Sequence, residues 1–123
     1  MKSEEYTYAK KLVESSLDEI WDAEVLMHYP VCCSNSFKSG LERCERWLIN
    51  NPEDPDLLRI LGELCIMGRI WGKAGSYLKK SSDIKRNPLT CWQLAKLYEK
   101  TNRKELAAES YKKGLALVTG QPL

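Results

Sequence analysis

The chain lacks the sequence features by which most enzymes and membrane proteins are recognised. It contains no run of about 18 apolar residues, so no segment is expected to span a bilayer. It contains no glycine-rich phosphate loop and no GxSxG or HExxH motif, which removes the usual indications of nucleotide binding and hydrolysis. We therefore expect a chain that has no catalytic activity of its own.

Ligands for a structural metal are equally scarce. There is one histidine, and the five cysteines form no CxxC pair. A structural zinc site needs four such ligands at regular spacing, so neither a metal nor another cofactor is expected. An odd number of irregularly spaced cysteines also argues against a disulfide framework. We expect reduced cysteines, several of them buried on helices, and a reducing compartment.

No excess of one charge sign is present either. The chain has 19 Lys and Arg against 17 Asp and Glu, a net charge of +2. This balance gives no reason to expect a nucleic-acid partner or direct binding to a membrane surface. The N-terminal sequence MKSEEYTYAKK is too polar for a secretory signal peptide.

What the chain does contain is an internal repeat. Shifting residues 57–114 by 33 positions superposes six pairs of residues. These pairs are Leu61 on Leu94, Gly62 on Ala95, Cys65 on Tyr98, Ala74 on Ala107, Leu78 on Tyr111 and Ser81 on Gly114. Such a period indicates stacked helix–turn–helix units, in which small residues let two helices cross closely and each unit covers its neighbour.

Proline and turn residues predict where these helices begin and end. Pro55 and Pro88 open the first helix of each unit, where a missing N–H is tolerated. Gly68–Arg69 and Thr101–Asn102 are the expected turns, and Asn102 suits a left-handed helix end. The expected units are 55–87 and 88–120, with helices over 55–67, 71–85, 88–101 and 104–117. Residues 119–123 are expected to be a frayed tail.

A less regular unit is expected over 18–54, preceded by a lead helix over 3–17. A shift of 34 residues places Gly40 at the position of Ala74, so Gly40 should lie at a helix crossing within a helix over 36–50. The first helix, over 18–29, has His28 where the other units have a small residue, and a large side chain there forces helices apart. Either this unit is distorted or its register shifts near Pro30; residues 30–36 are expected to be a loop.

The repeat residues resemble those of tetratricopeptide repeats. They are Leu61-Gly62, Cys65, Ala74 and Leu78, together with their counterparts 33 positions on. Cys65 departs from the usual aromatic residue, and Ser81 and Gly114 depart from the usual alanine. The resemblance implies an all-α fold of seven helices, a right-handed superhelix of antiparallel pairs with a concave face. The domain would span residues 1–123.

Residues 15–118 also resemble a narrower group, the C-terminal region of the HemY family. The residues that carry this resemblance are Leu64-Cys65, Trp71-Gly72-Lys73 and Tyr77. That family comprises bacterial inner-membrane proteins associated with haem biosynthesis. The resemblance implies a soluble fragment whose membrane helices lie outside this chain. It also implies a scaffold that recruits haem-pathway enzymes in porphyrin metabolism, without catalysis. A generic repeat adaptor with no link to haem is the alternative.

Two sets of residues are candidate sites. The positions expected to face the concave groove are Arg59, Glu63, Ile66 and Met67 in one unit and Trp92, Lys96, Glu99 and Lys100 in the next. Arg, Trp, Met and mixed charge suit an extended or helical peptide, and the alternative is a solvated face without a ligand. Trp71 either packs between units or anchors a partner.

The second set is His28, Cys32 and Cys33. Imidazole and thiolate are axial ligands of haem. Together with the HemY resemblance, they make a haem or porphyrin carrier the weaker functional hypothesis. The alternative is that the two cysteines are ordinary loop residues and that the histidine is packed locally.

Overall fold

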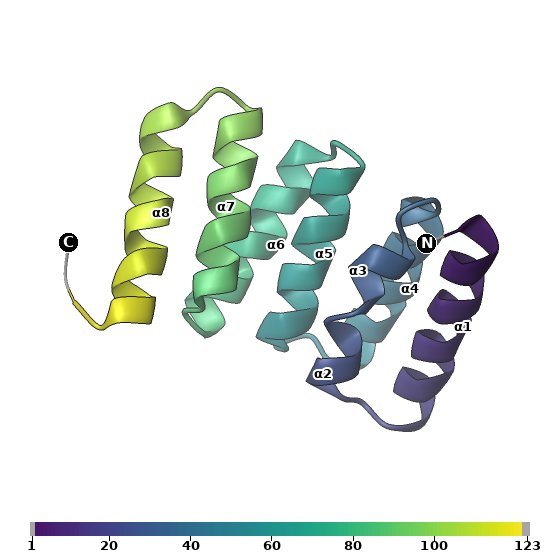
Figure 1. The fold of residues 1–123 in the computed structure, drawn as a ribbon. Helices are drawn as coiled ribbons and strands as arrows, with labels where there is room; N and C mark the ends of the chain where they lie inside the picture. The colour runs from purple at the N-terminus through teal and green to yellow at the C-terminus, as the bar shows by residue number, and fades with distance from the viewer. Residues whose placement is uncertain (1, 122–123) are drawn as a thin grey trace.

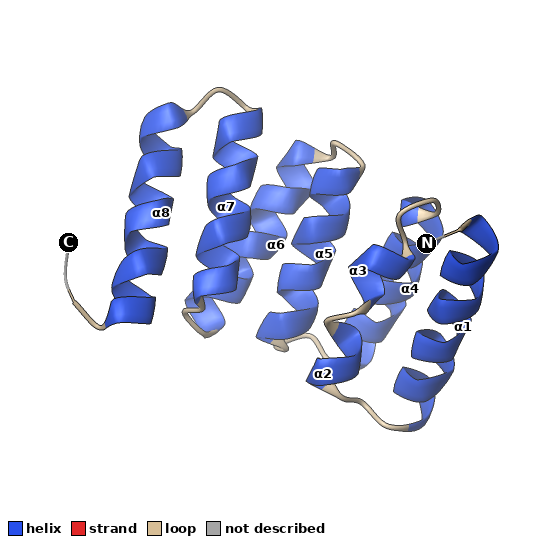
Figure 2. Ribbon diagram, viewed as in Figure 1, coloured by secondary structure: helices blue, strands red, loops and turns tan. Residues whose placement is uncertain are grey.

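The computed structural model describes residues 2–121, and every regular element among them is a helix (Figures 1 and 2). The helices are α1 (Ser3–Glu19), α2 (Ala23–Leu26), α3 (Tyr29–Cys32), α4 (Phe37–Asn50), α5 (Pro55–Met67), α6 (Trp71–Ile84), α7 (Pro88–Lys100) and α8 (Lys104–Thr119). They form a row that runs from α1 at one end to α8 at the other (Figure 1). The expected all-α class is confirmed. The tail residues Pro122 and Leu123 lie outside the described part.

Helices α5 to α8 form two hairpins of similar design. Helix α5 packs mainly on α6, and α7 packs mainly on α8. Helix α6 joins the two hairpins by packing on α7, and α4 packs on α5 in the same way. In addition, α5 contacts α7 directly. The two first helices therefore lie next to each other, and their side chains can form one surface.

The two hairpin turns are closed by the same left-handed cap. Arg69 and Asn102 have φ angles of 58° and 59°. In the first turn the Ile70 N–H donates to the Cys65 carbonyl at 2.8 Å, and the equivalent bond in the second turn measures 2.7 Å. These bonds use carbonyls that the ending helix leaves free. Asn102 was expected in this conformation, whereas Arg69 was not, because a long side chain adopts it at some cost.

The starts of α5 and α7 are also equivalent. The Asp54 carboxylate accepts from the N–H groups of Asp56 and Leu57 at 2.9 and 3.1 Å. The Asn87 side chain accepts from the Leu89 N–H at 2.8 Å. A proline follows each cap at the first helical position, as expected. Caps of this kind satisfy N–H groups that have no partner within the helix.

Each helix pair has one position where the absence of a side chain allows close packing. A Cβ on Gly62 would lie 2.5 Å from Cγ of Leu78, which packs from α6 onto the α5 backbone. A Cβ on Gly114 would lie 3.1 Å from that of Cys91. Gly40 has the same role at the expected place in α4, where a Cβ would collide with Cys33.

The irregular unit differs from its expected form. Helix α1 continues to Glu19, an extended segment follows, and the expected single helix is replaced by α2 and α3. Pro30 explains the break, because it has no N–H to donate to the Leu26 carbonyl in a continuous helix. The prediction of a loop over 30–36 is wrong for residues 30–32, which are helical. Among residues 2–121, eight helices therefore replace the seven expected.

The break also changes which residue meets Gly40. In the other units a small residue of the first helix lies near the crossing, and His28 was expected at that position. In the structure His28 lies in the turn between α2 and α3 and is exposed. Cys33, which follows α3, packs onto Gly40. The unit is therefore distorted near Pro30, and Cys33 rather than His28 lies at the crossing.

Helix α1 is attached to this unit by apolar packing of Leu17 and Val13 and by polar contacts. The Tyr29 hydroxyl donates to Glu14 at 2.5 Å, and the Trp47 indole N–H donates to Asp18 at 3.0 Å. Arg43 lies 3.6 Å from the Glu14 carboxylate and 3.2 Å from that of Asp18. The rings of Tyr29 and Trp47 meet edge to face, with centroids 5.2 Å apart. Hydrogen bonds to charged groups are stronger than neutral ones, so this network fixes the orientation of α1.

The glycine positions allow a matched test of the packing. Gly62→Ala should destabilise the fold by about 1–2 kcal/mol, because the clash with buried Leu78 outweighs the gain in helix propensity. Gly75→Ala should stabilise it by about 0.5–1 kcal/mol, because the helix gains alanine and the new Cβ meets only Leu97 at 3.6 Å. Urea denaturation of both variants measures this difference. Equal effects would show that the α5–α6 crossing does not depend on Gly62.

Candidate functional site

The predicted groove residues are distributed over the adjacent first helices α5 and α7. Trp92 is 50% exposed, and Lys96, Lys100 and Met67 are also exposed. Glu63 is half-buried between the two helices. The four exposed residues are therefore accessible to solvent, as a groove lining requires.

Contacts link several of these side chains to one another. The Lys96 ammonium lies 5.3 Å from the centroid of the Trp92 ring. The Trp92 ring also meets the ring of Tyr111 from α8 edge to face, with centroids 6.0 Å apart. The Tyr111 hydroxyl in turn donates to Glu99. We refer to Glu63, Trp92, Lys96 and Tyr111 as the α5–α7 face.

Burial dominates the chemistry of Glu63. Loss of solvent raises the pKa of this carboxyl above its ordinary value. The positive charges of Arg59 and Lys96 and the neighbouring Gln93 side chain oppose that rise in pKa but do not cancel it. Glu63 thus links the α5 and α7 sides of the face electrostatically and is poorly solvated itself.

Arg59 was predicted to line the groove, and the structure corrects this. It is only 5% exposed, and its Nε has no hydrogen-bond partner within residues 2–121. Helices α2 and α3 both pack against α5. Arg59 is therefore covered within the fold, and its positive charge acts on Glu63 without offering an exposed contact.

Two members of the site region were not predicted as such. Tyr111 entered the sequence analysis only as the repeat counterpart of Leu78, and it is half-buried and contacts Trp92. Gln93 is 9% exposed and lies beside Glu63. The sequence did contain a signal for the position of Tyr111, because tyrosine replaces the leucine found at the equivalent position of the preceding unit. The polar hydroxyl of tyrosine favours a half-exposed position.

The second candidate set, His28, Cys32 and Cys33, is not brought together around an open space. His28 is exposed, whereas Cys33 is fully buried on Gly40. The Cys32 thiol is directed at the His28 carbonyl, 3.2 Å away. Burial raises the pKa of Cys32, and it raises that of Cys33 to about 11, so both are thiols at neutral pH. Within residues 2–121, no group of three or more His, Cys, Asp or Glu side chains could hold a metal ion.

Comparison with known proteins assigns no family. No protein-family model matches the chain, and no curated protein matches it. The structure also contains, over residues 2–121, no helix with the length and apolar character that crossing a membrane requires.

The buried cysteines predict slow reaction with thiol reagents. Cys33, Cys44 and Cys65 are fully buried, and Cys32 and Cys91 nearly so. Because the thiolate is the reactive form, we expect Ellman's reagent at neutral pH to label the folded protein slowly and all five cysteines once it is denatured. A Ser34→Cys variant, with an exposed thiol in the same loop, is the matched control and should react fast. Fast labelling of Cys32 or Cys33 in the folded protein would contradict this packing.

The raised pKa of Glu63 predicts that Glu63→Gln stabilises the fold by an amount that depends on pH. Because the folded state holds this proton more tightly than the unfolded chain, wild-type stability falls as pH rises through the folded pKa. Glutamine mimics the protonated form, so the variant should be more stable at neutral pH. The gain should vanish below the unfolded pKa, which is about 4.3. Urea denaturation near neutral pH and in acid measures it, and an equal difference at both values would contradict the burial of Glu63.

Proposed function

We propose that the chain is a protein-interaction scaffold that binds a peptide segment of a partner on the α5–α7 face. The observation that carries this proposal is the half-exposed Trp92 ring, which contacts both Lys96 and Tyr111. Tryptophan and tyrosine are enriched among residues that dominate binding energy. A ring already held in place loses little freedom when a partner covers it.

The charges around Trp92 indicate what kind of segment fits. Lys96 on the rim and Glu63 beneath it offer one positive and one poorly solvated negative group within the same face. An extended or helical peptide can place an apolar side chain on Trp92 and Tyr111 and polar groups on either side. The face is formed by helices, which hold its residues in fixed relative positions.

We further propose that the helix pairs form a right-handed superhelix of the tetratricopeptide type. The 33-residue recurrence of Pro55 and Pro88, and of the caps at Arg69 and Asn102, supports this. A link to haem-pathway enzymes, and to the inner membrane through a segment outside this chain, depends only on the HemY resemblance and stays a prediction.

A peptide-display selection followed by affinity measurement tests the binding proposal. Peptides selected on the wild-type chain would be synthesised and titrated by fluorescence anisotropy. Trp92→Ala should weaken binding at least tenfold, the effect of removing a contact worth about 1.4 kcal/mol or more. Lys96→Ala should weaken it less, because a rim charge contributes less than a central aromatic side chain.

Ile49→Ala is the matched control for this experiment. Ile49 is also an exposed large apolar residue, but it lies on α4, away from the face. Its replacement should leave the affinity unchanged. Peptides that bind equally well to wild type and Trp92→Ala, or a selection that yields no peptide, would overturn the proposed function.

A further inference from the structure

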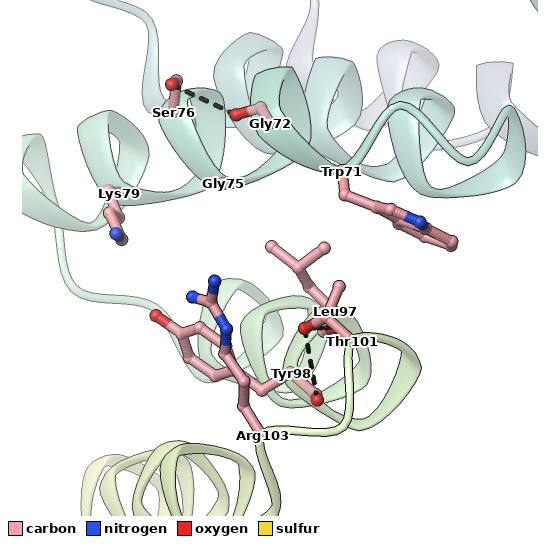
Figure 3. Close-up of a pocket in the computed structure, with 9 residues that line it drawn as sticks. All are labelled: Trp71, Gly72, Gly75, Ser76, Lys79, Leu97, Tyr98, Thr101 and Arg103. Carbon is pink, nitrogen blue, oxygen red and sulfur yellow. Dashed lines mark hydrogen bonds between the residues drawn. The ribbon is translucent and has the colours of Figure 1, made fainter.

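A second concave site lies on the opposite side of α7. It is a cavity of about 250 Å³ between α6, α7 and the turn into α8, shown in Figure 3. Leu97, Tyr98 and Thr101 line it from α7. At 100° per residue these positions lie across the helix from Trp92 and Lys96, so the cavity is separate from the α5–α7 face.

Comparison with the preceding unit shows why this space is open. Gly75 lies in the cavity wall, and its counterpart in α4, one position after Gly40, is Leu41, which is buried in the core. A leucine side chain is thus replaced by a hydrogen atom. The Gly75 Cβ position meets only Leu97, at 3.6 Å, and that of Gly72 meets nothing within 4 Å.

A second difference in sequence between the two units widens the same cavity. In the preceding unit, Phe37 packs so closely on Gly68 that a Cβ there would collide with its ring. The counterparts in the cavity are Trp71 and Thr101. Because Thr101 carries a side chain, Trp71 cannot approach as Phe37 does, and it stays half-buried at one end of the cavity.

The cavity has a cationic end and an apolar end. Lys79 and Arg103 extend toward the Tyr98 hydroxyl on one side, while Trp71 and Leu97 lie on the other (Figure 3). The counterparts of the two basic residues in the preceding unit are Glu45 and Ile70. Nine residues line the cavity and none is acidic. Within residues 2–121, neither Lys79 nor Arg103 forms an ion pair.

The other hydroxyl groups of the cavity are already occupied. The Ser76 hydroxyl donates to the Gly72 carbonyl at 3.2 Å, and the Thr101 hydroxyl donates to the Leu97 carbonyl at 2.9 Å (Figure 3). The side-chain groups left to recognise a ligand are therefore the Lys79 ammonium, the Arg103 guanidinium, the Tyr98 hydroxyl and the Trp71 indole N–H. All four can donate hydrogen bonds, and two are positively charged.

We propose that this cavity binds a small carboxylate that has a flat apolar body. The carboxylate would accept hydrogen bonds from Arg103, Lys79 and Tyr98, and the body would lie over Gly75 against Leu97 and Trp71. A guanidinium matches the two oxygens of a carboxylate in geometry. An inorganic anion would leave the apolar end empty, and a neutral ring would leave two cations without a partner.

Benzoate is the probe that tests this proposal. Its titration into the ¹⁵N-labelled chain should give saturable shifts of the Gly72 and Gly75 amide signals and of the Trp71 indole signal. Benzyl alcohol, which keeps the ring without the charge, should bind at least about tenfold more weakly. Inorganic phosphate, which keeps the charge without the ring, should also bind at least about tenfold more weakly.

Variants locate the site independently. Gly75→Leu restores the side chain found in the preceding unit and should abolish the shifts, and the smaller Gly75→Ala should reduce them if the leucine variant does not fold. Lys79→Gln combined with Arg103→Gln, both at exposed positions, should weaken benzoate binding at least about tenfold. Lys112→Gln is the matched control: it removes the equivalent exposed lysine one unit later, on α8, and should change nothing.

Three outcomes would overturn the proposal. Shifts that do not saturate would show that benzoate has no defined site. Unchanged affinity in the Lys79→Gln, Arg103→Gln variant, or in folded Gly75→Leu, would place the site elsewhere. Phosphate that binds as tightly as benzoate would show that the apolar end has no role in recognition.

Discussion

This structure depends on close contacts that neighbouring segments make at glycine positions. Gly62 accepts Leu78, Gly40 accepts Cys33 and Gly114 accepts Cys91, so each pair is joined at one tight crossing. A packed crossing of this kind tolerates little change in volume, so these contacts restrict how the paired helices can move against each other.

Both candidate sites follow from how these pairs stack. Helix α6 packs its hairpin onto α7 and thereby brings α5 into contact with α7. Glu63, Lys96 and Trp92 therefore form one face. The cavity arises where the stacking is incomplete, because Gly75 replaces the larger residue found at Leu41. One face is thus created by regular packing, and the other site is created by a local departure from it.

The sequence predicted the regular units well, since each prediction rested on local chemistry. Pro55 and Pro88 begin helices because the first turn needs no N–H from them, and Asn102 ends one because it tolerates a positive φ. It also identified Trp92 and Lys96 as neighbours, because they are one turn apart on the same helix. It failed over part of residues 18–36, where the 34-residue shift placed His28 at the crossing although Pro30 interrupts the helix.

The sequence by itself determined the all-α class, the 33-residue period, the two regular helix pairs and the small residues at their crossings, because these depend on spacing within a segment. Only the tertiary structure decided the burial of Arg59, the partner of Gly40 and the support that Tyr111 gives to Trp92. It also decided that Gly75 opens a cavity whose two cations, Lys79 and Arg103, form no ion pair within residues 2–121. Each of these features depends on which side chain of a neighbouring helix or turn packs against the residue. The repeat pattern within one segment does not determine that contact.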